Sequence, residues 1–256
     1  MEIAVLLKQV PSTESAIEIA EGETTIKTDG INWVVNPYDE MAVEEALKIR
    51  DAAGGSVTVF TLGPEKAVEA LRTALAMGAD TAVRIDTEGK TLDGLAVAKV
   101  LAGELKKGSF DLIVAGHRAV DDDNYQVGPA VAEFMGIPHI SMVVKQELEG
   151  DTIRCTRTIE GGTLVLETAL PALITTQRGL NEPRYTSLPG IMKAKKKPID
   201  TRALSATGTD VGAPMVNTIA LRLPPERKGG RIIEGESAAE KAAALVKVLH
   251  EEAKVI

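Results

Sequence analysis

Short apolar runs alternate with amphipathic segments along the first half of the chain. Residues 2–10, 56–62 and 110–115 are apolar at most positions, which is typical of strands buried on both faces. Residues 38–53 and 65–77 instead carry apolar side chains at helical spacing, and a glycine follows each segment. Strands that alternate with helices predict one parallel sheet with helices on both faces.

The remaining elements follow from the same patterns. An Asp29-Gly30 turn predicts a hairpin within residues 14–35, and Glu149-Gly150-Asp151 predicts a second hairpin. The second hairpin would join residues 137–148 to residues 152–159. Further strands are expected at residues 81–85, 164–168 and 172–176, and further helices at residues 92–107 and 126–135.

The stretch from Phe110 to Gly136 joins a buried strand, a polar turn and the start of a helix. Open parallel sheets bind nucleotides at such places, because free N–H groups and the positive end of the helix dipole face the phosphate. Several predicted strands end at the same rim, at Lys8-Gln9, Leu62-Gly63 and Gly116-His117. We therefore expect a nucleotide pocket whose floor is formed by residues 116–127.

Three consecutive aspartates, Asp121 to Asp123, lie in this floor. They either form a solvated turn that caps the following helix or face ribose hydroxyls, since carboxylates repel phosphate. A metal site is rejected, because the spacing fits no calcium loop and no His or Cys joins the acids. Asn36 is either a helix cap or a ligand contact. Lys8 is either a solvated edge charge or a group aimed at the ligand crevice, and taken alone it is expected to be solvated.

Composition narrows the classes of function. A net charge of −8 and only 3% aromatic residues disfavour a nucleic-acid partner. No run approaches the ~20 apolar residues of a membrane helix, and Met1 leads into a strand rather than a signal segment. The single cysteine, Cys155, cannot form an internal disulfide, so we expect a cytoplasmic protein without membrane insertion.

Two missing motifs disfavour common nucleotide enzymes. The chain has neither the G-x-G-x-x-G element of dehydrogenases nor the lysine loop of P-loop hydrolases. His117 lies in the right loop for acid–base chemistry, but no Ser or Cys nucleophile accompanies it in a recognisable pattern. We expect His117 to be a hydrogen-bonding or solvated residue, and Cys155 to be a strand residue rather than a reactive thiol.

The composition changes after Arg178. Residues 178–198, the docking segment, contain several prolines and a lysine run, and they form either a solvated linker or an exposed docking surface. Residues 201–217 are rich in Gly, Thr and Ala and predict an extended arm, and a capping box at residues 237–240 predicts a last helix. We divide the chain into an α/β domain, residues 1–198, and a C-terminal arm with a helix, residues 199–256, which packs on another chain or back on the domain.

Several motifs together resemble the β subunit of an electron transfer flavoprotein. The most specific stretch is residues 159–197, where IEGG, LPAL, LNEPRY and LPGIMKAKKK occur with the family's spacing. NPYDEMAVEEAL, RTALAMGAD and AVDDDN support the resemblance, which covers nearly the whole chain. It implies a three-layer α/β nucleotide-binding domain with a parallel sheet, similar to adenine nucleotide hydrolases.

The resemblance also implies a non-enzymatic electron carrier of fatty acid β-oxidation, built as a heterodimer. An α subunit would hold most of one redox FAD, and the C-terminal arm of this chain would embrace that subunit. The complex would take electrons from acyl-CoA-type dehydrogenases and deliver them to a membrane quinone oxidoreductase. This chain would bind a structural AMP.

The residues implied in these contacts form two sets. The AMP would contact Leu6, Asn36, Pro37, Tyr38, Asp39, Leu62, Gly116, His117, Arg118, Ala119, Val120, Asp121, Asp122, Asp123, Asn124, Tyr125, Gln126 and Val127. The dehydrogenase would contact the docking segment, where Leu188 is the anchor, through Tyr185, Leu188, Pro189, Ile191 and Met192.

The identity of the nucleotide stays open at the sequence level. Residues 126–129 (QVGP) resemble the electron-bifurcating branch of the family, in which a second FAD oxidises NADH, but Asp122 stands where that branch tends to have glycine. We expect AMP, with FAD as the alternative. Thr13 and Leu62 also differ from the tyrosine and cysteine that members often carry. A third hypothesis, a free-standing module of the stress-sensor kind, leaves the C-terminal arm and the docking segment without a use.

Overall fold

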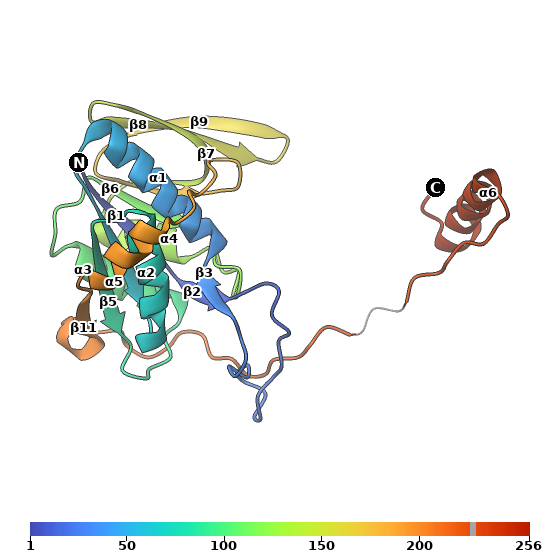
Figure 1. The fold of residues 1–256 in the computed structure, drawn as a ribbon, viewed down its shortest axis with the longest axis horizontal. Helices are drawn as coiled ribbons and strands as arrows, with labels where there is room; N and C mark the ends of the chain where they lie inside the picture. The colour runs from blue at the N-terminus through green and yellow to red at the C-terminus, as the bar shows by residue number, and fades with distance from the viewer. Residues whose placement is uncertain (226–228) are drawn as a thin grey trace.

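The computed structural model describes residues 1–225 and 229–256. Within these residues the main sheet has nine strands in the spatial order β11-β5-β4-β1-β6-β10-β7-β8-β9, and β2 pairs with β3 separately (Figure 1). The strands are β1 (Glu2–Leu6), β2 (Gln9–Pro11), β3 (Trp33–Val35), β4 (Ser56–Leu62), β5 (Thr81–Asp86), β6 (Leu112–Gly116), β7 (His139–Glu149), β8 (Thr152–Ile159), β9 (Gly162–Ala169), β10 (Ala172–Thr176) and β11 (Asp200–Ala203).

Helices cover both faces of the sheet. They are α1 (Pro37–Ala53), α2 (Val68–Met77), α3 (Gly94–Leu105), α4 (Val127–Met135), α5 (Leu188–Lys196) and α6 (Ala238–Val248), with the short turns η1 (Glu65–Ala67), η2 (Leu204–Ala206) and η3 (Leu249–Ala253). Helices α1 and α2 pack on one face of the sheet, and α3 and α4 pack on the other.

Strand β1 shows why the chain forms three layers. Successive side chains of a strand point to opposite faces, and every residue of β1 after Glu2 is buried. Ile3 and Val5 pack in the core beneath α1 and α2, whereas Ala4 and Leu6 pack in the core beneath α3 and α4. A continuous apolar run is therefore the pattern that a central strand requires.

The sheet is mostly parallel, with an antiparallel extension at one edge. Strands from β11 across to β7 pair in parallel, and β8 and β9 then pair antiparallel beyond β7. The extension contains the second predicted hairpin, which the structure confirms. Cys155 is buried in β8, and burial raises the pKa of its thiol to about 12, so it is a packing residue.

Two expected elements near the N-terminus differ from the structure. The strand predicted at residues 2–10 is interrupted after Leu6, because the Lys8 amide donates to the Asp39 carboxylate instead of a neighbouring strand. The prediction of a hairpin within residues 14–35 was wrong. The segment is mostly exposed, a single bridge joins Ile19 to Ile26, and β3 pairs with β2 instead, because few apolar side chains are available to bury a hairpin face.

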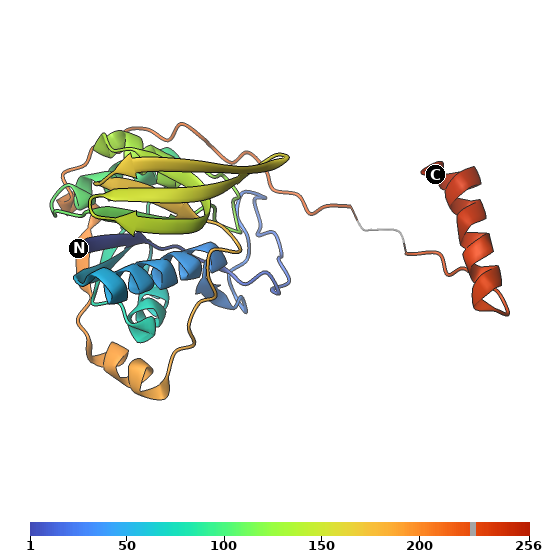
Figure 2. The same ribbon diagram turned by 90° about the horizontal axis from the view of Figure 1, so that it is seen from above.

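The C-terminal arm begins inside the sheet. Strand β11 pairs in parallel with β5, so the sheet extends past residue 198, where we expected the domain to end. Residues 207–225 form no helix or strand, and α6 lies apart from the domain in both views (Figures 1 and 2). Ser237 caps α6 as predicted, and α6 buries none of its residues within the described chain. Across residues 1–225 and 229–256, no helix has the length and apolarity needed to cross a bilayer.

Candidate nucleotide-binding site

A cavity of about 440 Å³ lies at the carboxyl ends of β1, β4, β5 and β6. The chain builds the sheet outward from β1 through β4 to β5 and then returns to place β6 on the other side of β1. The order of strands therefore reverses between β1 and β6, and open α/β sheets bind ligands in the crevice at such a reversal. The carboxyl rim expected from the sequence is the wall of this cavity.

Most of the expected nucleotide contacts line the cavity. These are Leu6, Asn36, Asp39, Leu62, Gly116, His117, Arg118, Ala119, Asp121, Asp122, Asn124, Tyr125, Gln126 and Val127. Pro37, Tyr38, Val120 and Asp123 lie outside the lining. Tyr38 is buried under Arg118, and Asp123 pairs with Arg118, so these two residues support the wall from behind.

Asp39 joins two strand ends beneath the cavity. One carboxylate oxygen accepts from the Lys8 amide at 2.7 Å and the other from the Gly116 amide at 3.0 Å. Burial raises the pKa of this carboxyl to about 7, although both amide hydrogen bonds oppose the rise. Since both oxygens are engaged by backbone amides, Asp39 shapes the floor of the cavity.

Asn36 fixes the loop that follows β6. Its side-chain amide donates to the Arg118 carbonyl at 2.8 Å, and its side-chain oxygen accepts from the Val120 amide at 3.2 Å. The side chain therefore bonds a distant loop instead of the first turn of α1, although Asn36 does precede that helix. The side chain of Asn36 therefore does not cap α1, and the residue lines the cavity, where a ligand contact stays a prediction.

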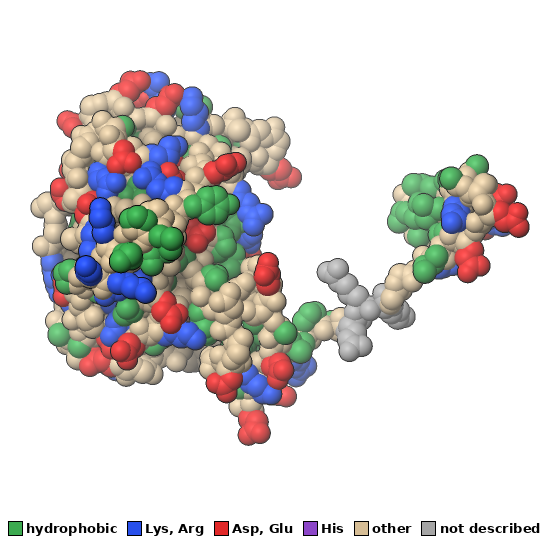
Figure 3. Space-filling view, in the orientation of Figure 1, with side chains coloured by type: hydrophobic (Ala, Val, Ile, Leu, Met, Phe, Trp, Pro, Cys, Tyr) green, Lys and Arg blue, Asp and Glu red, His purple; other side chains and the backbone are tan. Residues whose placement is uncertain are grey.

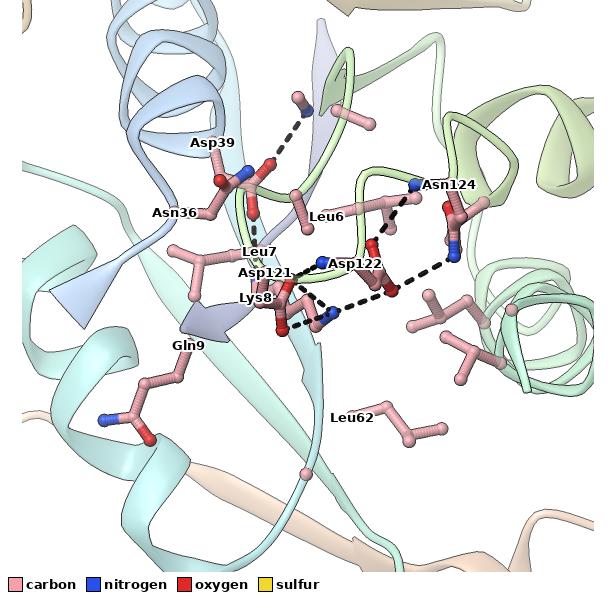
Figure 4. A pocket seen from close by; sticks show the side chains of 18 of the residues that line it. Leu6, Leu7, Lys8, Gln9, Asn36, Asp39, Leu62, Asp121, Asp122 and Asn124 are labelled. Atoms are coloured by element: carbon pink, nitrogen blue, oxygen red, sulfur yellow. Dashed lines mark hydrogen bonds and ion pairs between the residues drawn. The ribbon is translucent and has the colours of Figure 1, made fainter. Parts of the chain in front are cut away.

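Lys8 was missed as a site residue, because a lysine at a strand end reads as a solvated charge. Its ammonium lies 2.8 Å from Asp121 and 3.0 Å from Asp122, so it ties the aspartate loop to the end of β1 (Figure 4). Burial lowers the pKa of Lys8, but the two carboxylates outweigh this effect and raise it overall. Asp122 also accepts from the Asn124 side chain, whose oxygen accepts from the Gln126 amide.

Arg118 organises an aromatic cluster at the edge of the cavity. Its guanidinium donates to the Tyr38 hydroxyl at 2.9 Å, to the Tyr125 hydroxyl at 3.0 Å and to Asp123. His117 packs edge-on against Tyr125, with ring centroids 4.7 Å apart. Burial and the charges of Arg118 and Arg157 lower the pKa of His117, which favours the neutral imidazole at neutral pH.

Two helix N-termini meet at the cavity. Gly94 at the start of α3 and residues 126–128 at the start of α4 all belong to its lining. Their glycines permit close approach, since a Cβ on Gly94 would lie 3.0 Å from the Asn124 and Gln126 side chains, and one on Gly128 would lie 2.8 Å from Thr175. The Asp93 carboxylate already accepts from the Ala96 amide at the start of α3, whereas no side chain caps α4. The free amides and the positive dipole end of α4 therefore make this end of the cavity suited to an anion.

Several lining residues were not among the nucleotide contacts expected from the sequence, although Lys8, Gln9 and Gly63 were placed on the rim. They are Leu7, Lys8, Gln9, Trp33, Gly63, Pro64, Ala67, Thr87, Lys90, Leu92, Gly94, Val97, Leu101, Ala115 and Gly128. Those after β4 and β5 could have been found by extending the rim argument to every parallel strand end. Those at the start of α3 needed knowledge of how α3 and α4 pack.

The expected docking residues form an exposed surface on and beside α5, which packs against α2. The docking segment contains α5, which starts at Leu188 and is capped by Ser187. Part of the segment is therefore helical, and the segment as a whole is not a solvated linker or a loop. Tyr185 is 101% exposed, Leu188 78%, Met192 65% and Ile191 37%, and Pro189 is exposed as well. Figure 3 shows hydrophobic side chains gathered over α5 with Lys and Arg side chains around them.

Comparison with known proteins gives a consistent result. A family model described as "Electron transfer flavoprotein domain" matches residues 23–207. The chain is 44% identical over 260 residues to "Electron transfer flavoprotein subunit beta" of Bacillus subtilis (strain 168), with 100% of both chains covered. It is 40% identical to the protein of the same name from Syntrophomonas wolfei, covering 92% of this chain and 91% of that one. The human protein of that name is 37% identical, with 91% and 93% covered. The chain therefore belongs to the electron transfer flavoprotein family, among its β subunits.

Proposed function

We propose that this chain forms a heterodimer with an electron transfer flavoprotein α subunit and holds a structural AMP in the cavity between β1 and β6. The FAD of the complex, held mainly by the α subunit, supplies the redox chemistry. The complex carries electrons from acyl-CoA-type dehydrogenases to a membrane quinone oxidoreductase. In this proposal the chain is a carrier subunit, which binds and positions but has no catalytic residue of its own.

The single observation that supports AMP most strongly is the uncapped N-terminus of α4 at an apolar cavity. The uncapped amides at the start of α4 suit a phosphate, and Leu6, Leu62 and the residues after β4 offer an apolar surface for a base. The residues present thus fit an adenine nucleotide by their chemistry. Asp39 and Asn36 hold the backbone around the nucleotide, since their side chains form hydrogen bonds with backbone groups.

Two carboxylates lie close to the phosphate position proposed at the start of α4. Asp121 and Asp122 both line the cavity, and hydrogen bonds link Asp122 through Asn124 to the Gln126 amide before α4. Lys8 balances part of their charge, but two carboxylates face one ammonium. The phosphate monoester of AMP carries about −1.5 to −2 charges at neutral pH, close to the charge of the FAD pyrophosphate, so these carboxylates oppose both ligands alike.

The second candidate is a bifurcating subunit whose cavity holds FAD and oxidises NADH. It rests on residues 126–129 (QVGP), which begin α4 beside the expected phosphate position. This candidate requires the same cavity to accept a larger ligand and a second redox centre. It therefore makes a different prediction for what the purified complex contains.

One experiment separates the two candidates. The heterodimer is produced with its α subunit, denatured by heat, and the released nucleotides are separated by chromatography. We expect one FAD and one AMP per heterodimer, and no oxidation of NADH by the intact complex. Two FAD per heterodimer together with NADH oxidation would overturn the proposal of AMP and support the bifurcating subunit.

A further inference from the structure

Within the docking segment, Arg184 binds a buried carboxylate of α1. Arg184 donates to Glu44 from its backbone amide at 3.1 Å, from Nε at 2.7 Å and from an Nη at 3.1 Å. Glu44 is only 6% exposed, so these bonds form largely out of water. A bidentate guanidinium–carboxylate pair with a further amide bond fixes both the position and the direction of the backbone at residue 184.

Glu45, the next residue of α1, also has a buried carboxylate, and it binds the docking segment three residues before Arg184. Asn181 donates through its side-chain amide to Glu45 at 2.7 Å and to the Met41 carbonyl at 3.0 Å. Glu45 is 2% exposed and also accepts from the Gln146 side chain of β7 at 2.8 Å. Two consecutive residues of α1 therefore hold two points of the docking segment, three residues apart.

The far end of the segment is held by α2 and the turn that follows it. Arg72 donates to the carbonyls of Ala194 and Lys197, and the Lys197 ammonium donates to the Ala79 carbonyl at 2.6 Å. A Cβ on Gly190 would lie 2.8 Å from the Ala76 carbonyl, so α5 rests directly on α2. The segment is thus attached at both ends, and the exposed apolar residues lie between the attachments.

We propose that Glu44 and Glu45 are positioning residues, which hold the docking segment in its binding conformation before a dehydrogenase arrives. The inference rests on the proposed function, in which Leu188 and its neighbours form the surface for that partner. A preformed surface loses less conformational entropy on association than one that must fold on contact. The smaller entropy loss comes from the two buried carboxylates and their bonds to the segment. It therefore does not depend on which ligand occupies the cavity.

The test compares Glu44→Gln with Glu104→Gln in the complete flavin-loaded heterodimer. Glu104 is a matched control, because it is 1% exposed and bonded to Arg202 and Lys107 near the end of α3, which packs on the face of the sheet opposite to α1 and α5. Two quantities are measured in each complex. One is deuterium uptake by peptides covering residues 185–197, and the other is the kcat and KM of an acyl-CoA dehydrogenase with the heterodimer as its electron acceptor.

We expect Glu44→Gln to speed deuterium uptake across residues 185–197 and to raise the KM about tenfold, with kcat within about twofold, since tenfold is 1.4 kcal/mol of binding. Glu104→Gln should leave both readouts unchanged. A double variant, Glu44→Gln with Arg184→Met, should be no worse than the worse single variant, because both act through one pair.

The outcomes separate the inference from the function on which it rests. Unchanged deuterium uptake in Glu44→Gln would overturn the positioning role. Faster uptake with an unchanged KM would instead overturn the docking surface, since the segment would then be loosened without any effect on its supposed partner. Equal effects of Glu44→Gln and Glu104→Gln would reduce the effect to general destabilisation and would also overturn the inference.

Discussion

The Asp39 carboxylate accepts a hydrogen bond from the Gly116 amide, and it occupies the space that a side chain on residue 116 would need. These two residues lie 77 positions apart in the sequence. A Cβ on residue 116 would collide with Asp39 Oδ1 and would come within 2.9 Å of the Tyr38 Cβ. The start of α1 can approach the end of β6 this closely only because residue 116 is glycine.

Gly116→Ala should therefore displace Asp39 and open the floor of the cavity. We expect a loss of stability of ~2 kcal/mol from overpacking and a lower AMP content in the purified heterodimer. Urea denaturation and nucleotide chromatography measure the two effects. Gly162→Ala is the control, because a Cβ there meets nothing within 4 Å. Equal behaviour of the two variants would contradict the role given to Gly116.

The raised pKa of Asp39 predicts how stability depends on pH. A carboxyl whose pKa rises from 3.8 to about 7 on folding binds more protons when folded, so its contribution to stability declines as pH increases from about 4 to 7. The decline is at most ~4 kcal/mol, from 1.36 kcal/mol per pKa unit. Above pH 7 this contribution is constant.

Asp39→Asn removes the titration and should flatten this part of the profile. The measurement is the difference in unfolding free energy between wild type and Asp39→Asn at several pH values, in which the other titrating groups cancel. Wild type should lose stability relative to the variant as pH rises from 4 to 7. A difference that stays constant over that range would show that folding does not raise the pKa of Asp39.

Lys8→Met should loosen the aspartate loop without unfolding the domain. The side chain of Lys8 is 42% exposed, so its ion pairs with Asp121 and Asp122 contribute ~1 kcal/mol or less to stability. Without the ammonium, two carboxylates at the cavity lose their counter-charge, and we expect AMP to dissociate several-fold faster. Lys27→Met, which breaks an exposed pair with Glu18, should not change the off-rate. Retention of AMP at the wild-type rate would remove Lys8 from the site.

Leu188→Ala should weaken electron uptake from the dehydrogenase while AMP content stays the same. Leu188 is 78% exposed at the start of α5, and an anchor of this kind contributes ~2 kcal/mol or more to binding. The KM for the heterodimer should therefore rise more than tenfold. Val165→Ala on β9, at a position 59% exposed, provides a control of similar chemistry. If both variants accept electrons like the wild type, the docking surface lies elsewhere.

The sequence predicts the central sheet well because burial there leaves a direct pattern. A strand between two helical layers must be apolar on both faces, and residues 2–6, 56–62 and 112–116 carry that pattern. The position of the cavity follows as well, because every parallel strand ends at the same edge. The antiparallel edge could be read from its turn, Glu149-Gly150-Asp151.

What the sequence could not supply are the partners of individual polar groups. Asn36 precedes a helix and reads as a cap, but its bonds go to residues 118 and 120. Lys8 reads as solvated until the loop that carries Asp121 and Asp122 is placed beside it. Likewise β11 shows no apolar run, because it is an edge strand, and only its pairing with β5 reveals it.

The exposed apolar side chains within residues 207–225 have a consequence for a subunit synthesised in excess. Met215, Ile219 and Leu223 are each more than half exposed, so an orphaned copy would present an exposed apolar stretch to proteases and to other chains. Such a stretch is the kind of site at which nicking begins. If the chain pairs with an α subunit as proposed, copies that fail to find that subunit would be degraded first, and degradation would keep the two polypeptides in equal number.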